Sequence, residues 1–120
     1  MANIVALEEI LDEVKSSGGI TDAILVSRSG MHIAGKVPKG AHAETFVAMS
    51  AIMLGAAETS TSELKEKLKI VTILLEHSKV AMGVVSPKAV LVLKAGLTDP
   101  DEKLIEILIR MAPKFEKALA

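Results

Sequence analysis

The sequence contains no cysteine, no tryptophan and no tyrosine, and only two of its 120 residues are aromatic. Without cysteine the chain has no disulfide framework, no thiolate nucleophile and no cysteine-type zinc site. Scarce aromatic rings remove the stacking platforms of a single-strand binder, and a net charge of -1 gives no electrostatic reason to bind nucleic acid. We therefore expect no nucleic-acid partner, and the lack of cysteine is compatible with a cytoplasmic location.

Hydrophobic runs long enough to span a membrane are also missing. The longest candidate, 46–57, would extend roughly 18 Å as a helix, which is less than a hydrocarbon core of about 30 Å. The first residues carry no basic segment and reach Glu8 and Glu9 early, so no signal peptide is expected. We expect a chain that does not insert directly into a membrane and that buries its apolar residues against protein.

Apolar residues nonetheless make up half of the chain, and most of them are Ala, Val, Ile, Leu and Met. This balance, with a positive mean hydropathy, excludes intrinsic disorder. A length of 120 residues fits one domain, 1–120. A domain this short has limited interior, so the excess of small and medium apolar residues needs an explanation.

Three segments show the apolar spacing of helices. The first covers about 4–14 and is closed by Gly18 and Gly19, and the second covers about 41–67. The third begins with Asp99 as the N-cap and Pro100 at the first helical position. Pro113 is expected to kink or end the regular part of this last helix.

Five shorter apolar runs have the composition of β-strands. They cover 23–26, 31–34, 70–75, 80–85 and 89–95, with short connections between consecutive runs of each group. Both sides of the third run are apolar, so a sheet covered on both faces is expected. The fold class is therefore α+β: a five-stranded, mostly antiparallel sheet with helices on both faces, in the order α-β-β-α-β-β-β-α.

The middle helix is apolar nearly all the way round between Phe46 and Ala57. A sheet covers only one side of a helix, so the outer side would expose a patch too apolar for a monomer surface. The residues of that patch are Met49, Ile52, Met53 and Ala56. The simplest partner is the same helix of a second copy, because two-fold homodimers are the commonest oligomers. An unusually enclosed monomer core is the alternative.

The chain resembles the Roadblock family, which takes its name from a dynein light chain and has many prokaryotic members. The matching features are the strand, glycine-containing turn and strand of 23–34, a loop with Pro38, the helical segment 43–58, the three-strand meander and the terminal helix. The resemblance implies a profilin-like layer architecture, with the middle helix on one sheet face and the terminal helices on the other.

The resemblance also implies a function and an interface. Family members are dimeric platforms for small Ras-like GTPases, or adaptor subunits of larger assemblies. Their dimers form through the middle helix and the third strand, which here adds Val71, Thr72 and Ile73 to the four helical residues. No residue identifies a particular GTPase, and a heterodimer with a paralogue is an alternative to the homodimer.

Candidate catalytic and ligand-binding motifs are weak. Residues 30–37 have the glycine and lysine spacing of a P-loop, but Val37 stands where a hydroxyl is needed and the segment has the pattern of a strand. The histidines share no metal-ligand spacing, and we expect Arg28 to be a solvated turn residue rather than an arginine finger. We expect no enzyme activity, no cofactor and no metal; a small nucleotide binder using Lys36 is the least favoured alternative.

The sequence thus predicts a non-catalytic homodimeric scaffold or regulator that binds a small Ras-like GTPase or a related signalling or motility protein. An adaptor subunit with no GTPase partner is the main alternative.

Overall fold

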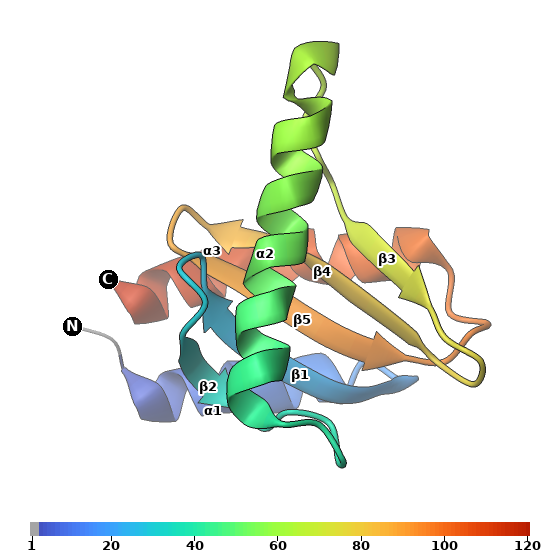
Figure 1. Ribbon diagram of the computed structural model, residues 1–120. Coiled ribbons are helices and arrows are strands. Elements are labelled where there is room, and N and C mark those ends of the chain that lie inside the picture. The colour runs from blue at the N-terminus through green and yellow to red at the C-terminus, as the bar shows by residue number, and fades with distance from the viewer. Residues whose placement is uncertain (1–2) are drawn as a thin grey trace.

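The computed structural model describes residues 3–120, which form three α-helices and five β-strands (Figure 1). The elements are α1 (Ile4–Lys15), β1 (Ile20–Ser27), β2 (His32–Gly35), α2 (Ala43–Thr61), a short 3-10 turn η1 (Ser62–Leu64), β3 (Val71–Leu74), β4 (Lys79–Ser86), β5 (Ala89–Ala95) and α3 (Asp101–Leu119). The predicted order α-β-β-α-β-β-β-α is confirmed.

The five strands form one antiparallel sheet in the order β2-β1-β5-β4-β3. The two long strands β1 and β4 flank β5, and all three are largely buried. The edges of the sheet are β2 and β3. Because β3 pairs only with β4, from Val71 opposite Met82 to Leu74 opposite Lys79, its other edge has no strand partner among the described residues.

Helices cover both faces of the sheet, as predicted. In Figure 1, α2 crosses in front of the sheet while α1 and α3 lie behind it. Alternate residues of the central strands point to opposite sides, since successive side chains of a strand do so. Leu91 and Leu93 of β5 therefore pack with α1 and α3, whereas Val90 and Val92 pack with α2.

The N-terminal half of the chain folds through the local signals that its sequence contains. Asn3 caps α1 by accepting a hydrogen bond from the backbone of Ala6 at 3.1 Å. Gly18 and Gly19 leave the helix with φ values of 78° and 77°, which glycine adopts without strain. His42 is the N-cap of α2, and its Nδ1 accepts from the backbone of Thr45 at 3.3 Å.

The middle helix is shorter than the predicted 41–67. It ends at Thr61, where the hydroxyl groups of Ser60 and Thr61 both donate to the carbonyl of Ala57. Serine and threonine side chains compete in this way with the helical backbone. Lys65 then adopts a left-handed φ of 58°, which closes the following 3-10 turn.

The predicted cap of α3 is wrong, and Pro113 does not end the helix. Pro100, not Asp99, is the cap residue, and it provides no side-chain bond. The Asp99 carboxylate instead accepts from the backbone of Gly96 at 2.9 Å and from Lys103 Nζ at 2.8 Å. The helix also continues through Pro113 to Leu119. The carbonyl of Ile109 loses its helical donor at Pro113, and Ile109 lies on an exposed part of the helix.

A polar cluster attaches α3 to the sheet. The buried ammonium of Lys79 on β4 donates to the Asp99 carbonyl at 2.7 Å and to Asp101 Oδ1 at 3.0 Å. Lys103 Nζ additionally donates to the carbonyl of Gly18 at 2.6 Å, which connects α3 to the loop after α1. The cluster therefore holds the start of α3 against two separate parts of the fold.

Candidate protein-interaction surface

The outer side of α2 is an exposed apolar surface. The helix buries Val47, Ala51 and Leu54 against the sheet, with Ser50 between them. On the opposite side, the exposed fractions of Met49, Ile52 and Met53 are 47%, 58% and 36%, and Ala56 is also exposed. The structure thus places all four helical residues of the predicted interface on the side of α2 that faces away from the sheet.

The second half of α2 makes little contact with the rest of the protein. No residue between Leu54 and Lys79 is buried, although this stretch contains the end of α2 and all of β3. Figure 1 shows the last turns of α2 projecting beyond the sheet. A Cβ added at Gly55 would meet no heavy atom within 4 Å. The last turns of α2 therefore lack a covering layer among the described residues.

The edge strand β3 lies beside this surface, and α2 contacts it. Val71 and Ile73 are half-buried and pack on the α2 side of the sheet, whereas Thr72 alternates to the opposite side. The open edge of β3 presents backbone groups that can pair with another strand. Leu74 is exposed at the end of the strand and lies within the segment 70–75 that the resemblance implies for the interface.

Arg28 lies in the β1–β2 turn and is exposed, as the sequence predicted, but it is not free of contacts. Its guanidinium forms an ion pair with Glu58, which connects the β1–β2 turn to α2. Both side chains are only about one-third exposed. The arginine that was considered as an arginine finger is therefore already engaged by a carboxylate of its own chain.

The P-loop-like segment 30–37 has the wrong structural context for phosphate binding. It contains the edge strand β2, and the next helix begins only at Ala43. A phosphate-binding loop instead leads directly into a helix, whose N-terminus faces the phosphate. The backbone N–H of Gly35 is donated to Glu8 Oε1 at 3.0 Å. This geometry removes the structural basis of the nucleotide-binding alternative.

Two of the three histidines contact neighbouring residues of the chain. His32 donates from Nε2 to the Gly35 carbonyl, and His77 contacts Glu76. Within residues 3–120, no group of three or more His, Cys, Asp or Glu side chains is arranged to hold a metal ion. None of the helices in that range is both long and apolar enough to cross a membrane.

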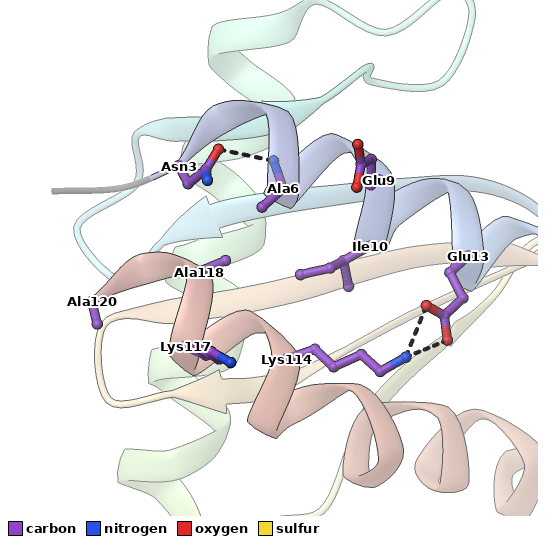
Figure 2. A pocket seen from close by; sticks show the side chains of 9 residues that line it. All are labelled: Asn3, Ala6, Glu9, Ile10, Glu13, Lys114, Lys117, Ala118 and Ala120. Atoms are coloured by element: carbon purple, nitrogen blue, oxygen red, sulfur yellow. Dashed lines mark hydrogen bonds and ion pairs between the residues drawn. The ribbon is translucent and has the colours of Figure 1, made fainter.

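A groove of about 590 Å³ lies between α1 and α3 (Figure 2). Its apolar part includes Ala6 and Ile10 of α1. Lys114 of α3 donates to both carboxylate oxygens of Glu13, at 2.9 and 2.7 Å, as the dashed lines in Figure 2 show. This ion pair connects α1 and α3 across the groove.

The sequence matches a known family model, and the fold resembles several solved structures. The family model described as the Roadblock/LC7 domain matches residues 6–95. None of the curated proteins matches the chain. Among solved structures, the gliding protein MglB of Thermus thermophilus is 23% identical, with a TM-score of 0.79 over 95% of this chain and 87% of that one.

Two further structures extend this comparison. A structure described as MglB with a tetrameric arrangement is 25% identical, with a TM-score of 0.76 over 96% of this chain and 90% of that one. A profilin of Schizosaccharomyces pombe is 13% identical, with a TM-score of 0.67 over 92% of this chain and 96% of that one, so the likeness to profilin is one of fold alone. The family match covers most of the sequence, and the chain belongs to the Roadblock/LC7 domain family.

Proposed function

We propose that this protein is a non-catalytic, homodimeric regulator or adaptor that binds a small Ras-like GTPase or a related signalling or motility protein. The observation that carries the proposal is the exposed apolar side of α2, formed by Met49, Ile52 and Met53, beside the edge strand β3, which contains no buried residue. An exposed apolar surface of this kind marks a protein-protein interaction site.

In the proposed dimer, the β3 edges of two copies pair and their α2 helices pack together. The interface residues are Met49, Ile52, Met53, Ala56, Val71, Thr72 and Ile73. Methionine, alanine and glycine allow two helices to approach closely, and the open β3 edge supplies backbone donors and acceptors. A two-fold arrangement uses the same patch on both copies, so no further surface is required.

Family membership supports a role in a small-GTPase pathway, because Roadblock/LC7 domains are in general regulatory or adaptor modules. The solved structures of MglB, one of them described as a gliding protein, extend this support to motility. We further propose that the protein acts in the cytoplasm.

An adaptor without a GTPase partner is the second candidate. The outer side of α2 presents apolar and small residues, and the nearby Arg28 is paired with Glu58. This surface therefore has no unpaired charged group that could contact the nucleotide of a bound GTPase. An adaptor does not need such a group, so the surface fits an adaptor as well.

An affinity pull-down from extract of the native cells distinguishes these functions. The immobilised protein is incubated with extract in the presence of either GDP or a non-hydrolysable GTP analogue, and the Met53→Glu variant serves as the control. Recovery of a small GTPase that depends on the nucleotide and is lost in the variant supports a GTPase partner. Recovery of structural subunits alone supports the adaptor, and recovery of no specific protein contradicts both.

A further inference from the structure

Helix α3 has a second apolar stripe beside the side that packs on the sheet. Its core side is buried against the sheet and consists of Leu104, Ile107, Leu108, Met111 and Phe115. Next to it, Ile105, Ile109 and Ala112 follow the spacing i, i+4, i+7, which places them in one stripe along the helix. Ile109 is 69% exposed. Ala112 packs against the core and Ile105 is half-buried, so Ile109 is the residue of this stripe that folding leaves exposed.

The stripe forms one wall of a groove of about 490 Å³. The opposite wall is the segment 67–69, which leads into β3, and Val84 of β4 lies between the two walls. Val84 is 40% exposed, unlike the other apolar residues of β4. Along α3 the lining runs from Ile105 to Glu116, or about 17 Å at 1.5 Å per residue. The groove is therefore as long as three turns of a docked helix.

The charges around the groove are unequal. Lys67 and Lys69 line one wall, and neither side chain has a hydrogen bond or ion pair with any residue of the range 3–120. The carboxylate among the lining residues is Glu116, toward the end of α3. Two unpaired ammonium groups beside an apolar floor favour an occupant that brings carboxylates to that wall.

We propose that this groove docks an amphipathic helix of a partner protein. The aliphatic side chains of that helix pack on Ile105 and Ile109, and its acidic side chains pair with Lys67 and Lys69. Helix-in-groove recognition of this kind uses apolar anchors spaced i, i+3, i+4 and i+7. The surface is distinct from the outer side of α2, so the proposal stands independently of the proposed dimer.

Two other occupants fit less well. A second copy docked groove to groove by two-fold symmetry would bring the lysine walls of both copies together, and like charges oppose such contact. A small molecule requires a pocket that buries most of its surface, whereas the central residue of this groove, Ile109, is 69% exposed.

The test uses two synthetic helical peptides of about 18 residues, long enough to populate a helix in solution. Both carry leucine on one face; one has glutamate beside the leucines, and its twin has lysine at the same positions. Binding to the nitrogen-15-labelled protein is followed by NMR. The acidic peptide is expected to shift backbone amides of α3 and of 67–69, and to bind about tenfold more tightly than the basic twin, which equals about 1.4 kcal/mol.

Variants locate the binding. Ile109→Asp is expected to weaken binding of the acidic peptide at least about tenfold, whereas Val5→Asp, at an equally exposed helical position on α1, leaves it unchanged. The double variant Lys67→Glu, Lys69→Glu is expected to reverse the preference between the two peptides. The proposal is overturned if neither peptide binds at millimolar concentration, if the shifts map to α2, or if Ile109→Asp alters the mass of the protein in solution instead of peptide binding.

Discussion

At the scale of single residues, Lys79 is the most unusual side chain in the fold, because its ammonium group is buried. It donates to the Asp99 carbonyl and to the Asp101 carboxylate and so satisfies the polar groups that begin α3. A buried charge of this kind is tolerated only when it is paired. Its contribution is therefore to hold α3 on β4.

Replacing Lys79 with methionine keeps most of the side-chain volume and removes the donor. We expect the free energy of unfolding to fall by about 1–3 kcal/mol, because the two acceptors lose a buried partner. Urea denaturation followed by circular dichroism measures this change. Lys88→Met is the matched control, since Lys88 is exposed, and it should change the stability by less than about 0.5 kcal/mol. Equal effects of the two variants would contradict the anchoring role.

Asp99 makes the free energy of unfolding depend on pH in the acidic range. The Lys103 ammonium and then the Gly96 backbone N–H donate to its carboxylate and hold its pKa below the ordinary value. A lowered pKa in the folded state contributes stability above about pH 4, the ordinary aspartate range, and this contribution is lost as the pH falls through the lowered pKa.

The Asp99→Asn variant should therefore lose stability less steeply between about pH 4 and pH 2 than the native chain. Unfolding measured across this range tests the expectation. Asp12→Asn, on the exposed side of α1, serves as the control and should leave the slope unchanged. If Asp99→Asn and the native chain had the same slope, the Asp99 carboxylate would not be the origin of the acid sensitivity.

Individual residues also show where sequence reasoning stops. Asp99 and Pro100 have the identity and spacing of a helix start, and the helix does begin at Asp101. The Asp99 carboxylate, however, accepts hydrogen bonds from Lys103 and from the backbone of Gly96 instead of from the first turn of the helix. These partners could not be predicted from the local sequence. The pairing of Arg28 with Glu58 likewise requires two elements to meet in space.

At the scale of elements, α3 contains a proline that removes one helical hydrogen bond. The helix runs through Pro113 because the affected turn is exposed, and the core side chains Met111 and Phe115 hold it on both sides. Pro113→Ala restores the missing N–H and is expected to raise the free energy of unfolding by about 1–3 kcal/mol. Denaturant unfolding measures the change. A decrease in stability would show that the ring packs favourably enough to offset the lost bond.

The existence and type of every α-helix and strand followed from local patterning, and their ends did not. The apolar runs 23–26 and 80–85 extend in the structure to β1 and β4, because antiparallel neighbours pair with the polar residues that flank them. The middle helix ends early because its hydroxyl side chains bond back to the helix. Element ends therefore depend on tertiary partners and on competing side-chain hydrogen bonds.

At the scale of the whole molecule, the layer arrangement was predictable because the middle helix and the strands are apolar on more than one side. That same pattern placed four interface residues on the outer side of α2, where the structure exposes them. The strand order and the groove beside α3 were not predictable from the sequence. Both depend on β3 pairing with the edge of β4 that faces away from β5. In the proposed dimer, the excess of apolar residues becomes half of a core that two copies share.

The shared core is tested most directly by the mass of the protein in solution, measured by gel filtration with light scattering at micromolar concentration. We predict a mass of about twice the 12.6 kDa of one chain. Met53→Glu should give the mass of one folded chain, because an unpaired carboxylate is costly in a dry interface and is tolerated at a position that is 36% exposed in the protomer. Val5→Glu, on α1, should remain dimeric. A native chain with the mass of a monomer would contradict the account, and a dimeric Met53→Glu variant would place the interface elsewhere.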